Sequence, residues 1–138
     1  MVKLDKIYTR GGDEGKTSLG NGDRVKKYNL RVDTYGDFDE ASSAIGIAII
    51  YSSNETRNML RNIQNDLFDL GADLSVPSNL KKKVLRVNDD QVKYLEDSID
   101  LMNESLEDLN SFILPGGSKS SSFLHFARCV VRLSLIHI

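Results

Sequence analysis

A chain of 138 residues has room for one domain with its own core and is too short for two ordinary domains. Its formal net charge of −2 excludes the large positive field with which a protein attracts nucleic acid or an anionic membrane. Cys129 is the only cysteine, which excludes an internal disulfide and a cysteine-rich metal site. The chain begins without an apolar secretory segment and has no apolar run near the roughly 18 residues of a membrane span, so we expect a cytoplasmic protein.

Residues 9–24 form a glycine-rich stretch that holds five of the chain's ten glycines. Glycine permits left-handed backbone conformations, so we expect an ordered loop without regular structure, and we predict no strand anywhere in the chain. Free backbone N–H groups in such a loop suit a polyphosphate. Side chains that could join them are Thr9, Arg10, Thr17, Ser18, Arg24, Lys26 and Lys27. The loop is not a Walker A motif, because no glycine lies five positions before Gly15. The alternative is an exposed, turn-rich tail.

Two helices are predicted after this loop. Apolar residues at helical spacing predict the first from about Val32 to Tyr51. Asn54 is expected to cap the second, which Pro77 ends. The apolar positions are Tyr35, Phe38, Ala41, Ile45 and Ala48 in the first helix, and Leu60, Ile63, Leu67, Leu70 and Leu74 in the second. The second set alternates steps of three and four, which is typical of packed antiparallel helices.

Two more helices complete the predicted fold. A capping signal at Asn88 and Gln91 precedes a third helix that is expected to reach about Leu106. A loop at 111–122 interrupts the pattern, and helical spacing resumes at Phe123 without a visible end. The third stripe is Val92, Leu95, Ile99 and Met102, and the fourth is Phe123, Phe126, Ala127 and Val130. The sequence therefore predicts an all-α, up-and-down helical bundle.

Charged residues on the first and fourth predicted helices are candidates for a binding site. Asp39 and Glu40 lie on the first helix, and Arg128 and Arg132 are four residues apart on the fourth, so both arginines point the same way. The alternative is a solvated face, or ordinary ion pairs between helices.

Three further residues have plain structural interpretations. Phe112, which is followed by two more apolar residues, is expected to anchor a loop in the core. His125 is expected to be a hydrogen-bonded core histidine rather than a metal ligand, and Cys129 a small buried hydrophobic residue. We therefore predict no metal ligands among the side chains.

Three segments taken together resemble a known family. They are YTRGGDEGKTSLG at 8–20, KYNLRVDTYGDFDEASSAIG at 27–46 and FILPGGSKSSSFLHFARCVVR at 112–132. In this order they are similar to the cobalamin adenosyltransferases of propanediol-utilising bacteria and human mitochondria. The similarity extends over nearly the whole chain, and the joint match is much more specific than any one segment.

The resemblance implies a five-helix bundle that forms homotrimers and binds ATP and cobalamin between neighbouring subunits. Asp39 would pair with Arg128 across the interface, Arg132 would reach the nucleotide, and Phe112 would lie below the corrin ring. Mg²⁺ would sit on the phosphates rather than on protein ligands. The residues implied to hold ATP are Thr9, Arg10, Gly11, Gly12, Thr17, Ser18 and Lys27.

The implied reaction transfers the 5′-deoxyadenosyl group of ATP to cob(I)alamin and releases triphosphate, with a flavoprotein reductase as a partner that supplies electrons. One alternative is a non-catalytic carrier or sensor that binds ATP or adenosylcobalamin on the same bundle. Another is a helical interaction protein, which only the leucine pattern at 60–74 favours.

The sequence departs from the family pattern at three places. Gly11 replaces a frequent threonine, and Ala41 and Ser42 replace Leu-Asn after the Asp-Glu pair. The third departure is the end, so we expect 1–132 to be a single, incomplete adenosyltransferase domain lacking the last helix. We expect 133–138 to be a non-native tail, because LSLIHI is what a common sequencing adapter encodes in this frame. Without the last helix, the fourth helix should expose an apolar face.

Overall fold

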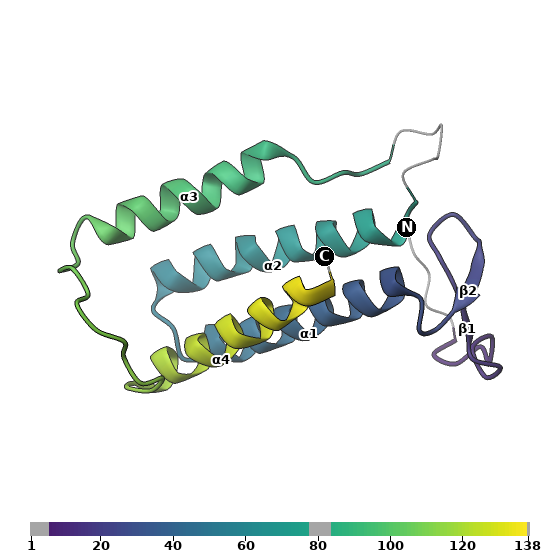
Figure 1. The fold of residues 1–138 in the computed structure, drawn as a ribbon, viewed down its shortest axis with the longest axis horizontal. Helices are drawn as coiled ribbons and strands as arrows, with labels where there is room; N and C mark the ends of the chain where they lie inside the picture. The colour runs from purple at the N-terminus through teal and green to yellow at the C-terminus, as the bar shows by residue number, and fades with distance from the viewer. Residues whose placement is uncertain (1–5, 78–83, 138) are drawn as a thin grey trace.

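The structure is a computed structural model that describes residues 6–77 and 84–137 (Figure 1). Its helices are α1 (Leu30–Ile50), α2 (Asn54–Ser75), α3 (Asp89–Asn103) and α4 (Lys119–Ser134), followed by a short 3-10 helix, η1 (Leu135–His137). Strands β1 (Lys16–Ser18) and β2 (Arg24–Lys26) precede them. The predicted helical bundle is confirmed. The end of α4 together with η1 covers residues 133–137 of the expected tail. Ile138 lies outside the described residues.

Each helix begins at a side chain that satisfies free backbone N–H groups. Ser53, rather than the predicted Asn54, caps α2, because its hydroxyl accepts the N–H of Thr56 at 3.3 Å. The predicted capping box of Asn88 and Gln91 is present at α3, although α3 ends at Asn103 instead of near Leu106. Ser118 caps α4, so that helix begins before the apolar spacing that predicted it.

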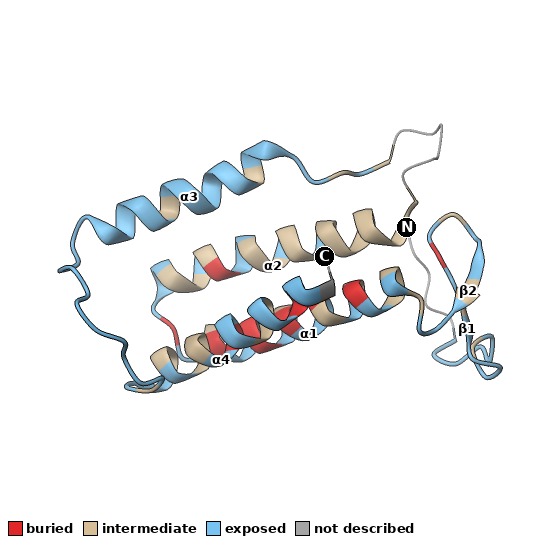
Figure 2. Ribbon diagram, viewed as in Figure 1, coloured by how far each residue is buried: buried red, intermediate tan, exposed pale blue. Residues whose placement is uncertain are grey.

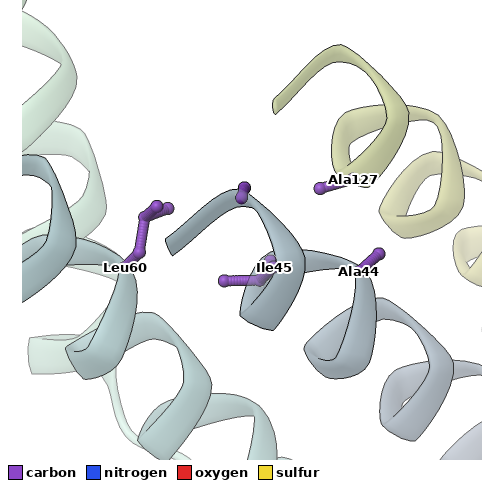
Figure 3. Close-up of a cluster of buried hydrophobic side chains, with 5 residues drawn as sticks. Ala44, Ile45, Leu60 and Ala127 are labelled. Carbon is purple, nitrogen blue, oxygen red and sulfur yellow. The ribbon is translucent and has the colours of Figure 1, made fainter. Parts of the chain in front are cut away.

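The core lies along α1, which packs between α2 and α4. Buried residues gather on α1 in Figure 2, and Figure 3 shows its side chains between Leu60 of α2 and Ala127 of α4. Ala44, Ala48 and Ala127 are small, so the backbones of α1 and α4 can approach closely. Four of the five predicted inward positions of α1 are confirmed as buried, namely Phe38, Ala41, Ile45 and Ala48, and the fifth, Tyr35, is half-buried.

Helix α3 stands apart from the other helices (Figure 1). None of its residues is buried. Two side-chain hydrogen bonds link it to α2, from Gln91 to Asp66 at 2.8 Å and from Asn62 to the Tyr94 hydroxyl at 3.2 Å. Its predicted apolar stripe is exposed to solvent. Helix α4 exposes an apolar face, as expected, and this face includes Leu133 and also Phe126, a member of the helix's predicted apolar stripe. The described bundle therefore carries apolar surface that its own helices do not cover.

A short antiparallel hairpin forms inside the glycine-rich loop, so the prediction that the chain has no strand is wrong. Strand β1 pairs with β2, and Thr17 lies opposite Val25. The turn between them closes with two bonds made by Leu19, whose N–H donates to Asp23 O and whose carbonyl oxygen accepts from Gly22 N–H, both at 2.9 Å. Each strand has three residues, which is too short for the alternation that predicts a strand.

Candidate functional site

Arg24 orders the glycine-rich loop by bonding to three of its residues. Its guanidinium donates to the carbonyl oxygens of Gly11 and Lys16 and to the Ser18 hydroxyl, the last at 3.2 Å. These bonds use one cation to hold the two arms of the hairpin and the preceding turn together. The sequence placed Arg24 among cations available to a ligand. The structure instead gives it an internal role, which no local sequence signal could indicate.

Lys27 brings a positive charge to the glycines at the start of this loop. Its backbone N–H donates to Gly15 O at 3.0 Å, and its side chain lies against Gly12. A Cβ atom added at Gly12 would lie 3.1 Å from the Lys27 ammonium nitrogen and 3.0 Å from its Cε. Gly11 N–H also faces the Thr9 hydroxyl oxygen at 3.5 Å. Thus Thr9, Gly11, Gly12 and Lys27 come together, as the resemblance implies.

Arg10 lies beside a small hollow at the start of the loop. It has a left-handed φ of 57°, which is uncommon outside glycine. Its guanidinium carbon lies 5.8 Å from the centre of the Tyr8 ring, and the Lys6 ammonium lies 5.3 Å from the same ring. These three residues and Thr9 line a hollow of about 290 Å³. Two cations at one opening favour an anionic ligand.

Asp39 lies in a groove between α1 and α2 that has a volume of about 250 Å³. The groove is mostly apolar, and Phe68 on its α2 side is 80% exposed. We call it the α1–α2 groove, and its lining residues are Tyr35, Phe38, Asp39, Ser42, Leu67, Phe68, Gly71 and Ala72. An exposed carboxylate at an apolar surface of this kind is placed to orient a large, partly apolar ligand or a cationic partner group.

Arg128 lines a different hollow, of about 400 Å³, at the beginning of α4. We call it the α4 pocket, and it is lined by Ser118, Ser120, Ser121, Leu124, His125 and Arg128. Gly116 and Gly117 have positive φ values in the turn that precedes it. Within one chain, therefore, Asp39 and Arg128 line separate hollows. Arg132 is exposed one turn further along α4.

Three plain structural interpretations from the sequence are wrong. Phe112 is fully exposed in the segment between α3 and α4, so it does not anchor the core. Cys129 is exposed, because it is two residues beyond the inward-facing Ala127 and so lies on the far side of the helix. His125 is half-buried and lines the α4 pocket instead of the core.

The described residues contain no group of three His, Cys, Asp or Glu side chains that could hold a metal ion. Among the same residues, no helix is both long enough and apolar enough to span a membrane. The site residues that the resemblance implies lie in or next to the glycine-rich loop, in the α1–α2 groove and in the α4 pocket, except Phe112 and Arg132, which lie outside these places.

Comparison with known proteins identifies the family. The sequence profile of the cobalamin adenosyltransferases matches residues 7–134. The chain belongs to the cobalamin adenosyltransferase family. The match includes the glycine-rich loop and helices α1 to α4, so it covers the candidate site residues described above except Lys6.

Several members of the family are similar to this chain over most of its length. The corrinoid adenosyltransferase of Mycobacterium tuberculosis is 48% identical over an alignment of 135 residues, and the match covers 95% of this chain and 70% of that protein. The Bacillus subtilis corrinoid adenosyltransferase is 41% identical over 92% of this chain and 67% of its own length. The chain thus spans about 70% of such relatives.

A solved structure has the same fold. It is a variant of a PduO-type ATP:corrinoid adenosyltransferase from Lactobacillus reuteri, complexed with cobalamin and ATP. Its TM-score is 0.88 at 33% sequence identity, and the match covers 96% of this chain and 75% of that one. The similarity in both sequence and backbone shows that this adenosyltransferase has the same helical-bundle fold as the PduO-type enzyme.

Proposed function

We propose that this adenosyltransferase transfers the 5′-deoxyadenosyl group of ATP to cob(I)alamin and forms adenosylcobalamin and triphosphate. The observation that carries the proposal is the ordered glycine-rich loop, in which the ammonium group of Lys27 lies over Gly12. A cation beside unobstructed backbone suits a polyphosphate, since ligand oxygens can approach without meeting a side chain. Family membership supplies the corrinoid half of the reaction.

The loop would hold the triphosphate of ATP. Lys27 and Arg10 supply positive charge, and the hydroxyls of Thr9, Thr17 and Ser18 supply donors. Gly11 and Gly12 leave room for phosphate oxygens. Mg²⁺ accompanies the phosphates and neutralises part of their charge, and Arg132 adds a contact to the nucleotide. Together, these groups would hold ATP with its C5′ carbon exposed toward the corrinoid.

The corrinoid would bind where copies of the chain meet in a homotrimer. Asp39 and Arg128 lie in separate hollows of one chain, so we propose that Asp39 of one copy pairs with Arg128 of a neighbouring copy. Phe112 is free to cover the lower face of the corrin and exclude the axial ligand. A four-coordinate cobalt is more easily reduced to the cob(I) state. We place this reaction in the cytoplasm, with a flavoprotein reductase as the electron donor.

No protein nucleophile or general base is needed. The cobalt of cob(I)alamin attacks C5′ with its electron pair and forms the Co–C bond. The C5′–O bond breaks, and its electron pair leaves with triphosphate. The chain's residues therefore orient the two substrates and stabilise charge on the leaving group, which agrees with a site composed of cations, hydroxyls and glycines.

The test is turnover of ATP, Mg²⁺ and chemically reduced cob(I)alamin, followed by the absorbance change of adenosylcobalamin and by assay of triphosphate. We expect both products in equal amounts. Asp39→Asn or Arg128→Ala should lower kcat/KM by roughly 100-fold, because each removes a charge that orients the corrinoid. Normal turnover by both variants would contradict the site assignment. Binding of ATP and corrinoid without a Co–C bond would show a carrier or sensor instead.

A further inference from the structure

The turn of the β1–β2 hairpin docks on the carboxyl end of α2. Gly20, in this turn, donates its backbone N–H to Ser75 O at 2.8 Å. The neighbouring Leu19 is buried. Figure 1 shows the hairpin at the end of the bundle where α2 finishes and α1 begins. One end of the hairpin is thus fixed to the bundle, while the other end carries the glycines and Lys27 of the candidate ATP site.

Close packing against the end of α2 explains why glycine occupies position 20. A Cβ atom there would lie 2.7 Å from Val76 Cγ2 and 3.0 Å from Ser75 Oγ. Carbon atoms in contact prefer about 3.5–4.0 Å, so the Val76 side chain or one of the two backbones would have to move. The φ angle of Gly20 is outside the left-handed region, so strain in the backbone does not explain the residue.

Two arginines also bond to the end of α2 that Gly20 contacts. Arg31 of α1 donates to Leu74 O at 3.0 Å. Arg86 donates to Asp73 O at 3.1 Å and to Val76 O at 3.0 Å, and it forms an ion pair with Asp73. The last carbonyl groups of a helix have no partners within the helix, and here arginines and Gly20 supply them. The carboxyl end of α2 is therefore a fixed seat for the hairpin turn.

The paired strands connect this seat to the ATP loop. Lys16 and Lys26 are paired at the far end of the three-residue ladder, roughly 10 Å from the turn at the usual rise per residue. Beyond them, Lys27 N–H bonds to Gly15 O and the Lys27 side chain lies against Gly12. A displacement of the turn would be carried along the ladder to the phosphate-binding end, because the two strands move as a unit.

We infer that Gly20 is a positioning residue for ATP, which acts by letting the hairpin turn seat against Ser75 and Val76. The inference rests on the proposed function, because it assumes that the loop binds ATP. It assigns a role in the reaction to the carboxyl end of α2, although that end contributes no group to the nucleotide.

The test is a size exchange between Gly20 and Val76. Gly20→Ala should raise the Kd and the KM for ATP by about tenfold, since displacement of a site by a fraction of an ångström has effects of that order, and kcat at saturating ATP should change less. Adding Val76→Ala removes Cγ2, the closest atom that the new methyl meets, and leaves the 3.0 Å contact with Ser75 Oγ, which needs a much smaller shift. The double variant should therefore bind ATP within about threefold of wild type. Gly36→Ala is the matched control, because a Cβ at Gly36 meets nothing within 4 Å.

Thermal unfolding of each variant confirms that it is folded before ATP titration by calorimetry. Unchanged ATP affinity in Gly20→Ala would overturn the inference, and so would a loss that Val76→Ala fails to restore. A wild-type chain that binds ATP but forms no Co–C bond would overturn the proposed reaction. The inference about Gly20 could then still be tested, because it depends on the Kd for ATP of the variants and not on turnover. A wild-type chain that binds no ATP overturns both.

Discussion

At the scale of single residues, the two glycines before the hairpin have different surroundings. A Cβ at Gly12 would meet the Lys27 side chain at 3.0 and 3.1 Å, whereas a Cβ at Gly11 would meet only the Thr9 hydroxyl at 3.6 Å. The first contact is closer than ordinary van der Waals separation, and the second is normal. The pair therefore separates the effect of displacing Lys27 from the effect of adding a methyl group to the loop.

We predict that Gly12→Ala raises the KM for ATP by about tenfold, because the methyl group pushes the Lys27 ammonium away from the phosphates. Gly11→Ala should raise it by a smaller factor. Initial rates of adenosylcobalamin formation at varied ATP, with cob(I)alamin saturating, give both values. Equal KM values for the two variants would show that the position of Lys27 over Gly12 is not important for binding.

Much of the loop's composition could be predicted, but its internal contacts could not. The grouping of Thr9, Gly11, Gly12 and Lys27 follows from a motif in one short segment. The contacts of Arg24 depend on how the loop folds back on itself, and those of Gly20 on the close approach of α2, so their immediate neighbours in sequence do not indicate them. The exposure of Phe112 and Cys129 was missed because an apolar side chain was assumed to be buried.

At the scale of elements, the carboxyl end of α2 depends on Asp73. Burial by itself raises the pKa of this carboxyl, but the hydrogen bond from Val87 N–H and the Arg86 guanidinium lower it by more, so the pKa lies below its ordinary value. A group with a lowered folded-state pKa contributes stability above its unfolded pKa of about 3.9. That contribution is lost as the pH falls through the folded-state pKa.

We predict that Asp73→Asn lowers the free energy of unfolding at pH 7 by about 1–2 kcal/mol, because it leaves Arg86 and Val87 N–H with a weaker acceptor. The difference from wild type should shrink as the pH falls below about 4, where the wild-type carboxyl is protonated too. Urea unfolding at several pH values measures this. Asp97→Asn, which removes the partner of the exposed Lys93, should cost less. A pH-independent difference for Asp73→Asn would contradict the explanation.

The helices were predictable because their signals are local. Capping residues and repeated apolar positions lie within each segment, and all four helices were found with errors of a few residues at their ends. The three-residue strands were missed because pairing across a turn, rather than alternation within a strand, creates them. The detachment of α3 could not be predicted either, since an apolar stripe indicates that a face is to be covered and does not say by what.

At the scale of the whole molecule, the separation of Asp39 from Arg128 allows a test of assembly. In a ring of identical copies, each site would take Asp39 from one chain and Arg128 from its neighbour. We predict that Asp39→Asn and Arg128→Ala, each nearly inactive alone, recover activity when unfolded together and refolded as a mixture. About a quarter of the interfaces would then contain both native residues, so up to about a quarter of wild-type activity should return.

Sedimentation analysis of the same mixture should show trimers. The control is to refold each variant separately and combine the products immediately before the assay, which should leave activity low. Trimers without recovered activity would mean that the two residues act within one chain or in different steps.

Among the described residues, α1 is common to all of these features. Its first turn carries Arg31, which holds the end of α2; its middle carries Asp39; and its alanines receive α4. A small rotation of α1 about its own axis would alter the end of α2, the α1–α2 groove and the bundle packing simultaneously. Substitutions that shift this helix, unlike those that leave its packing unchanged, will therefore produce mixed phenotypes.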